Sequence, residues 1–282
     1  MSAEVKITQR GLFKKLPKFE ELLMPDMKYG VMDDGYRLDD GKTGEYTVVY
    51  FPEFMHRGFE LHIEKNSVFI RQPYPTSEKE IHLFCDYIRF LCGKLNAKDF
   101  EWEGNKTDLN NTENYITDSV SVCKSALKHM LTEIEEKGQT FYIFGIMNPI
   151  ALGAKEMDEI GDDLDKFGEY LHRLQSMDVF YPDPQVFRRK DGKVFAFYVL
   201  TIDLPSVVPT IPKILMSPKT KVDEWYIVIF DGSTNKQAAA FDFFEFLENI
   251  DKSEIYDAEH FLLTLRGEDV EKLKEKCRMC DI

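Results

Sequence analysis

Positive charge is scarce in this sequence of 282 residues: 36 Lys and Arg stand against 50 Asp and Glu, for a formal net charge of −14. Phosphate backbones and anionic membrane surfaces attract clustered Lys and Arg, so this balance predicts neither a nucleic-acid nor a membrane partner. A basic partner protein would be favoured in encounter rate. Solubility in a cytosol explains the same charge more simply, and both interpretations stay open.

Long hydrophobic runs are also missing. No segment approaches the roughly 18–20 consecutive apolar residues that span a bilayer, and the longest runs, such as 194–202, are short. The N-terminal stretch MSAEVKITQRGLFKKL is polar and lacks the sustained apolar run of a signal peptide. We therefore expect a cytoplasmic protein without a membrane span.

Cysteine is sparse, and its count of five is odd. In a long chain without a signal peptide, this usage predicts reduced thiols. Cys277 and Cys280 have the spacing of a metal knuckle, but no second pair stands at the distance that a four-ligand zinc site needs. Two terminal thiols are the simpler interpretation, and a labile disulfide between them stays open. The sequence predicts no metal and no cofactor.

Recognisable catalytic motifs are absent. Gly41-Lys42-Thr43 resembles the end of a phosphate loop, but Tyr36 stands where that loop requires glycine. There is no G-x-S-x-G elbow and no H-E-x-x-H pair. The acidic run 156–165 lacks the calcium-loop pattern and favours a solvated helix face; a docking surface for a basic partner is the alternative.

Apolar and aromatic residues are plentiful: hydrophobic residues make up 43% of the chain, with 22 Phe and 13 Tyr. Each buried Phe or Leu stabilises a fold by roughly 1.5–3 kcal/mol, so a large core is expected. The clearest helix follows a capping box at Ser77 and Glu80, and its apolar residues recur at helical spacing. They are Ile81, Phe84, Cys85, Ile88, Leu91, Cys92 and Leu95.

Other patterns predict further strands and helices. We expect a strand at 57–63, with Phe59, Leu61 and Ile63 on one face, hairpin-paired through Lys65-Asn66 to 68–71. The remaining expected elements are a polar loop at 101–114, helices at 117–137 and 155–177, a strand at 141–146, an Asp191-Gly192 hairpin, an irregular proline-rich stretch at 205–218, a strand at 224–230, a helix capped by Asp242, a strand at 260–265 and a helix at 268–277.

These elements predict an α+β fold, with mixed or antiparallel sheets packed by about five helices and a β-α-β-α pattern at the C-terminus. The best boundary candidate lies near Tyr181-Pro-Asp-Pro184, where a helix ends and strand-rich sequence starts. We therefore expect an N-terminal α+β region at 1–180 and a C-terminal one at 181–282. One continuous domain is the alternative.

Candidate site residues flank two of these predicted elements. His56 and Arg57 stand at the entrance of a predicted strand, and histidine titrates near physiological pH. His56 is therefore a candidate base or phosphate contact, with a polar strand-edge role as the alternative. Asp178, Tyr181 and Asp183 follow the third predicted helix, in which His172 lies off the apolar stripe. We expect any binding site where His56 and Arg57 approach 178–183.

Three stretches have patterns that periodicity does not dictate: Arg57-Gly-Phe-Glu with the hairpin and capped helix after it; 144–153 (FGIMNPIALG) with 174–181 (LQSMDVFY); and 243–247 (FFEFL) with 256–261 (YDAEHF). Together they resemble an uncharacterised bacterial family of similar length, the domain of unknown function 4299 family. The resemblance would cover most of the chain from about Tyr46 onward. The family has no assigned activity, so the resemblance implies no function.

Three hypotheses for function follow. The first is a non-catalytic interaction protein of a bacterial cytosol, in one version an immunity-type inhibitor that covers a basic partner. The second is an enzyme of unrecognised family, with a site near His56, Arg57 and the proline-rich loop. A pocket of several hundred Å³ with converging polar groups would support that enzyme, and a flat surface would end it. The third is self-association through sheet edges or the third helix, since the sequence leaves the oligomeric state open.

Overall fold

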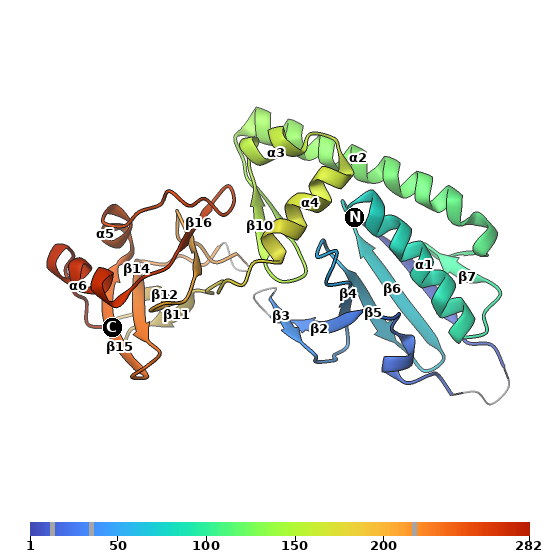
Figure 1. Cartoon of the computed structure of the whole chain (residues 1–282), viewed down its shortest axis with the longest axis horizontal. Helices are drawn as coiled ribbons and strands as arrows, with labels where there is room; N and C mark the ends of the chain where they lie inside the picture. The colour runs from blue at the N-terminus through green and yellow to red at the C-terminus, as the bar shows by residue number, and fades with distance from the viewer. Residues whose placement is uncertain (12–14, 34–36, 216–218) are drawn as a thin grey trace. The chain divides into compact units, whose positions relative to one another are not determined.

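The structure is a computed structural model that describes residues 1–11, 15–33, 37–215 and 219–282 (Figure 1). The chain divides into two compact units, Met1–Ser176 and Met177–Ile282, and each is described by itself. Tyr36 lies outside the described residues, as do residues 12–14 of the N-terminal stretch and residues 216–218 at the end of the proline-rich stretch.

The first unit is built on an antiparallel sheet in the order β3-β2-β4-β5-β6-β1-β7-β8. The N-terminal strand β1 pairs with β6 along its whole length and with β7 on its other side, which places the start of the chain inside the sheet. The strands are β1 Ser2–Thr8, β2 Lys28–Met32, β3 Leu38–Asp40, β4 Thr47–Tyr50, β5 Phe59–Ile63, β6 Ser67–Pro73, β7 Phe100–Trp102 and β8 Asn105–Thr107, with short 3-10 helices at Phe19–Leu22 and Leu109–Asn111.

Helix α1 (Glu78–Lys94) packs on this sheet and confirms the clearest expectation from the sequence. Phe84 and Leu91 of the helix are fully buried, together with Ile7 on β1 and Phe59 and Leu61 on β5. The β5–β6 hairpin is confirmed as well. Ile63 is the exception: it is the last residue of β5 and stays 38% exposed.

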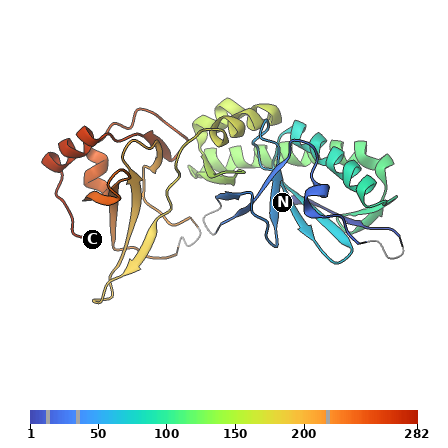
Figure 2. The same ribbon diagram turned by 60° about the horizontal axis from the view of Figure 1, so that its bottom comes forward.

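Further helices pack beside α1 in the first unit (Figures 1 and 2). Helix α2 contacts α1, α3 and α4, and the short hairpin β9–β10 leads into α3. The predicted strand at 141–146 is confirmed in β9, and Gly138 ends α2 in the left-handed conformation, as expected for a helix C-terminus. The elements are α2 Thr112–Lys137, β9 Phe141–Phe144, β10 Pro149–Leu152, α3 Ala154–Ile160 and α4 Leu164–Gln175.

The expectation of one helix at 155–177 is wrong. The segment forms two helices, because Gly161 adopts a left-handed φ of 62° that ends α3. The Asp163 carboxylate then accepts hydrogen bonds from the backbone N–H groups of Asp165 and Lys166 and starts α4. The apolar residues at helical spacing are nevertheless buried on both sides of the break, from Met157 to Leu174.

The expectation of a polar loop at 101–114 is also wrong. Strands β7 and β8 form a hairpin whose turn residues, Glu103 and Gly104, both have positive φ, as in a type I′ turn. The Glu103 side chain accepts a hydrogen bond from the backbone of Glu4 on β1. β8 is the edge strand of the sheet, and edge strands carry polar residues, which is why composition alone suggested a loop here.

The second unit holds a sheet in the order β11-β12-β14-β15, in which β12 and β14 run parallel and the other pairs antiparallel. Its core includes Leu200, Ile227, Phe241 and Phe246, and a separate pair of strands joins β13 to β16. The elements are β11 Gln185–Arg188, β12 Val194–Thr201, β13 Ser206–Pro209, β14 Glu224–Asp231, β15 Lys236–Asp242, α5 Phe243–Glu248, β16 His260–Leu263 and α6 Gly267–Lys276.

The α+β fold class is confirmed. The described residues form six helices rather than about five, since the third expected helix is split in two. The Asp191-Gly192 hairpin is present, and Asp242 caps α5. In the second unit, two strands were not anticipated: β13 lies in the proline-rich stretch, and β15 follows β14 ahead of α5. In the first unit, β1, β2, β3 and β10 were not anticipated either, nor was the β7–β8 hairpin. Within the described ranges, no helix is long and apolar enough to cross a membrane.

Gly168 on α4 is required by the close packing of α4 against the start of α1. A Cβ atom at this position would lie 2.7 Å from the Cβ of Ser77 and 2.8 Å from Cε1 of His56. We expect Gly168→Ala to destabilise the protein by roughly 1–3 kcal/mol through overpacking. Gly93 inside α1 is the matched control, since nothing lies within 4 Å of its added Cβ; Gly93→Ala should stabilise by about 0.5–1 kcal/mol. Urea unfolding of both variants measures the difference, and equal effects would contradict this packing.

Candidate functional site

Arg57 and Glu80 form a polar connection inside the first unit. The Glu80 carboxylate, 3% exposed, accepts hydrogen bonds from the backbone N–H of Arg57 (3.2 Å) and of Gly58 (2.8 Å) and from the Thr76 hydroxyl. The Arg57 guanidinium donates to three carbonyls, of Phe144, Tyr74 and Pro75, at 3.0–3.2 Å. Loop 51–58, between β4 and β5, is thereby tied to α1 and to β9.

The capping box predicted at Ser77 is half present. Ser77 Oγ accepts a hydrogen bond from the Glu80 N–H at 3.1 Å and caps α1. The Glu80 carboxylate, however, binds loop 51–58 instead of turning back to the Ser77 backbone. Burial raises the pKa of Glu80 to about 7 and lowers the pKa of Arg57 to about 10, because both charged forms lose hydration.

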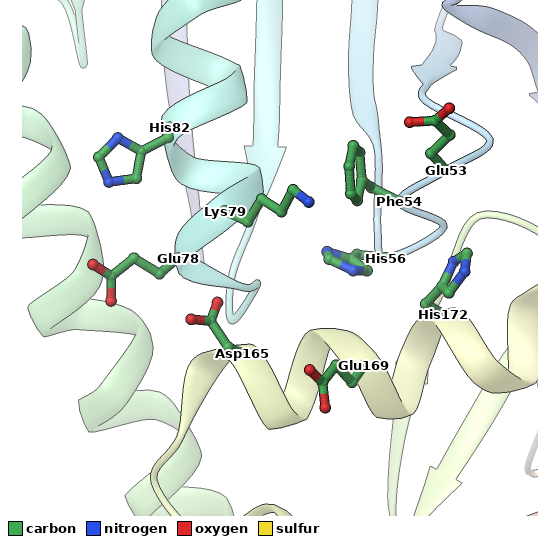
Figure 3. A pocket seen from close by; sticks show the side chains of 9 residues that line it. All are labelled: Glu53, Phe54, His56, Glu78, Lys79, His82, Asp165, Glu169 and His172. Atoms are coloured by element: carbon green, nitrogen blue, oxygen red, sulfur yellow. The ribbon is translucent and has the colours of Figure 1, made fainter.

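A pocket of about 530 Å³ opens beside this connection, and it is lined by side chains from loop 51–58, α1 and α4. Figure 3 shows Lys79 extending from α1 toward Phe54 and His56, while Asp165, Glu169 and His172 follow one another along α4. Within the described chain, the lining residues are Glu53, Phe54, His56, Glu78, Lys79, His82, Asp165, Glu169 and His172.

His56 is the buried polar group of this pocket, at 6% exposure. Its Nδ1 lies 2.7 Å from Ser77 Oγ, and its Cε1–Nε2 edge faces α4 at Gly168. Among the described residues, Nε2 has no hydrogen-bonding partner. Burial lowers the pKa of His56 to about 4, with smaller contributions from His172 and Lys79, so the imidazole is neutral at pH 7.

The hydrogen bonds of Ser77 suggest how the two nitrogens of His56 divide their roles. A hydroxyl oxygen has two acceptor lone pairs, and the Glu80 N–H occupies one of them on Ser77. If His56 Nδ1–H donates to the other, Nε2 is left as an acceptor on the ring edge that faces α4 at Gly168. His172 has the opposite arrangement: its Nδ1 accepts from the Met55 N–H at 3.1 Å, so neutral His172 carries its proton on Nε2.

Negative charge in the pocket exceeds positive charge. Glu53, Glu78, Asp165 and Glu169 bring four carboxylates, and Lys79 is the lysine of the lining. In the part of the chain that the structure describes, none of these four carboxylates forms a salt bridge. No three His, Cys, Asp or Glu side chains among the described residues are placed to hold a metal ion together. The lining therefore carries more negative than positive side chains.

The remaining residues considered for the site lie in the second unit, while His56 and Arg57 belong to the first. Asp178 is exposed and Asp183 is half-buried. The hydroxyl of Tyr181, which is 7% exposed, lies 3.1 Å from His260 Nε2, and His260 Nδ1 lies 2.7 Å from the carboxylate of Asp257. This buried network joins the start of the second unit to the beginning of β16.

The cysteines form no disulfide: all five are free, and Cys85, Cys92, Cys123 and Cys277 are buried. Burial raises the pKa of both Cys277 and Cys280, which favours the protonated thiol over a reactive thiolate.

Comparison with known protein families identifies a family for this chain. A family described as a domain of unknown function (DUF4299) matches residues 2–273. The chain belongs to this family. Searches of the curated proteins and of the solved structures found no match to the chain.

Of the stretches that carry the resemblance to the DUF4299 family, the one that begins at Arg57, the stretch 144–153 and the end of α4 contact one another in the first unit, whereas 243–247 and 256–261 lie in the second unit. Arg57 donates to the carbonyl of Phe144. The Gln175 side chain accepts from the Asn148 N–H at 3.0 Å and donates to the Asn148 carbonyl at 2.9 Å. These contacts hold the β9–β10 turn against the end of α4. They explain why Asn148 and Gln175 stand at these positions, which hydrophobic periodicity does not.

Most of the pocket residues were not anticipated from the sequence. Asp165, Glu169 and His172 stand four and three residues apart and therefore share one face of α4, and Glu78 and His82 share one face of α1. This spacing could have indicated from the sequence that these residues line a common site. The acidic run, however, also fits a solvated helix face, and only the packing of α4 beside α1 and loop 51–58 brings these faces together.

We expect Arg57→Lys to destabilise the protein by roughly 3–5 kcal/mol, because lysine cannot reach three carbonyls in a fixed fork and leaves buried acceptors unpaired. Arg71→Lys is the matched control, since Arg71 pairs with Glu60 at a half-exposed position. We expect this variant to destabilise the protein by about 1 kcal/mol or less. Chemical denaturation of both variants measures the difference. Similar losses would show that the Arg57 connection is unimportant.

Stability should depend on pH through His56 and Glu80, with opposite signs. Between pH 6.5 and about 4 the unfolded chain protonates His56 and the folded chain does not. The folded chain therefore loses stability through His56 as pH falls over this interval. Between pH 7 and 4.5 the folded chain protonates Glu80 and the unfolded chain does not. The folded chain therefore gains stability through Glu80 as pH falls over this interval.

The variants His56→Gln and Glu80→Gln separate these two pH-dependent contributions to stability. Relative to wild type, His56→Gln should gain roughly 1–3 kcal/mol on going from pH 7 to pH 4.5, and Glu80→Gln should lose stability over the same interval. Urea unfolding at several pH values measures both. A difference from wild type that does not change with pH would refute the pKa shift of that group.

Proposed function

We propose that this chain is a non-catalytic interaction protein whose pocket receives a basic side chain of a partner protein. The observation that carries the proposal is the set of four carboxylates without salt bridges around a pocket that contains the nine-tenths buried, neutral His56. A guest cation would find acceptors there in His56 Nε2 and in the carboxylates. Charged hydrogen bonds of this kind are roughly twice as strong as neutral ones.

The charge of the whole chain supports the same partner. A net charge of −14 attracts a basic protein over a distance of about a Debye length, near 10 Å in ordinary salt. Long-range attraction sets the encounter rate, and the pocket then supplies the specific contact. An inhibitor or immunity-type protein that covers a basic partner surface would use both effects, and a cytoplasmic location would place it beside such partners.

Catalysis by the same pocket receives less support, although its volume and converging polar groups meet the criterion set for the enzyme hypothesis. A general base works best when its pKa lies near the operating pH. His56, with a pKa of about 4, is a weak base at pH 7. The Arg57 guanidinium donates to backbone carbonyls and does not line the pocket.

Capped pentapeptides test the proposal directly. Two carry a central lysine or arginine between glycines, and their neutral counterparts carry norleucine or citrulline. We expect the basic peptides to bind and the neutral ones not to, with affinity that falls as salt is raised. The double variant Asp165→Asn/Glu169→Gln should weaken binding by about tenfold, equal to about 1.4 kcal/mol. Calorimetry and NMR titration of the histidine resonances give the affinity and the location.

The control keeps the change in net charge and moves it out of the pocket. Glu135 and Glu136 are exposed residues of α2 outside the pocket lining, so Glu135→Gln/Glu136→Gln should leave binding near wild type. Equal binding of norleucine and lysine peptides would refute the proposal. So would equal losses in the two double variants, because the attraction would then be a property of net charge alone.

A further inference from the structure

Lys79 stands at a position where the helix itself disfavours it. It is the second residue of α1, and the N-terminus of a helix carries a partial positive charge that favours anions. Its neighbours Glu78 and Glu80 are the residue types that stabilise such a terminus. The local energetics of α1 therefore give no reason for a lysine here, and its contacts must be sought in the pocket.

The Lys79 side chain crosses the pocket to an aromatic ring. Its ammonium lies 3.3 Å from the centroid of the Phe54 ring, in a cation–π contact, and Figure 3 shows the chain extending from α1 toward Phe54. The negative face of an aromatic ring attracts cations. Within the described residues, Lys79 forms no salt bridge. The Phe54 face is thus a cation subsite that holds a primary ammonium of the chain itself.

We propose that the guest of the pocket is a lysine-type primary ammonium, and that Lys79 is a tethered competitor that takes the place of this ammonium on Phe54 while the pocket is empty. This inference rests on the proposed function, and it names the group that the partner presents. The subsite holds an ammonium on a flexible aliphatic stem, and a partner lysine carries the same group on the same stem.

A tethered competitor has a consequence for selectivity. The intramolecular ammonium has a high effective concentration, so a free amine that offers one contact is displaced easily. A lysine on a protein surface brings further contacts around the pocket and can overcome the competition. The apparent affinity is lowered by the fraction of time for which Lys79 covers Phe54, and removal of the Lys79 charge should restore it.

The variant Lys79→Met tests this, because methionine removes the ammonium and keeps a long unbranched side chain. We expect the lysine pentapeptide to bind Lys79→Met about tenfold more tightly than wild type, as for a subsite that is covered nine-tenths of the time. Lys94→Met is the matched control: Lys94 lies on the same helix with its ammonium 5.1 Å from the centroid of the Phe90 ring, outside the pocket lining. Its affinity should equal that of wild type.

A spectroscopic readout follows the displacement itself. The Phe54 ring current should shift the ε-methylene protons of Lys79 upfield in the free protein, and the shift should disappear as the lysine pentapeptide binds. Phe54→Leu should abolish this shift in the free protein and weaken binding of the peptide. A purely structural role for Lys79 predicts no change in its ε-methylene signals during the titration.

The outcomes separate this inference from the proposed function. If neither wild type nor Lys79→Met binds basic peptides, the proposed function fails and this inference fails with it. If wild type binds the lysine peptide through Asp165 and Glu169 but Lys79→Met binds it no more tightly, only the competitor role is overturned. If the arginine peptide binds Lys79→Met more tightly than the lysine peptide does, the assignment of a primary ammonium is overturned.

Discussion

The carboxylate of Glu80 binds the backbone of residues 57 and 58 inside the first unit, and the pocket depends on this interaction. It holds loop 51–58 at the start of α1, together with the contacts of Met55 with His172 and of His56 with Ser77. The loop carries Glu53, Phe54 and His56, which form one side of the pocket. Arg57 extends the same connection to β9 through the Phe144 carbonyl. Burial of both charges makes the connection costly to form and strongly destabilising to break.

This anchor explains how His56 can be buried and neutral. Ser77 caps α1, and the same hydroxyl lies 2.7 Å from His56 Nδ1. Gly168 lets α4 approach until its backbone meets the other edge of the ring. The imidazole is therefore held on two sides, and burial keeps it uncharged. The pocket consequently combines a neutral imidazole with surrounding carboxylates, and this combination supports the proposal of a guest cation.

The fold followed from the sequence where hydrophobic spacing decides it. Helix α1 is amphipathic along its length, so its buried residues could be identified one by one. Hydrophobic spacing predicted the wrong structure where backbone conformation determines the end of a helix. The 3-4 pattern of apolar residues continues through 155–177, but the left-handed φ of Gly161 breaks the helix. The sequence also predicted a loop in place of the β7–β8 hairpin, because the polar edge strand β8 resembles a loop in composition.

The candidate site was less predictable than the fold. His56 drew attention because histidine titrates near neutral pH, but nothing in its neighbourhood in sequence indicates Ser77, Gly168 or His172 as its surroundings. Arg57 was a candidate site residue beside it, whereas its guanidinium donates to backbone carbonyls and does not line the pocket. Contacts between residues this far apart in the chain depend on how α1, α4 and loop 51–58 pack, which periodicity does not encode.

The most direct test of this account is a crystal structure of the chain with a lysine-containing peptide bound. The account predicts a lysine ammonium on the face of Phe54, within hydrogen-bonding distance of His56 Nε2 or of the pocket carboxylates, with Lys79 displaced. A peptide bound at another surface, or a pocket whose carboxylates are filled by basic residues of the chain itself, would contradict it.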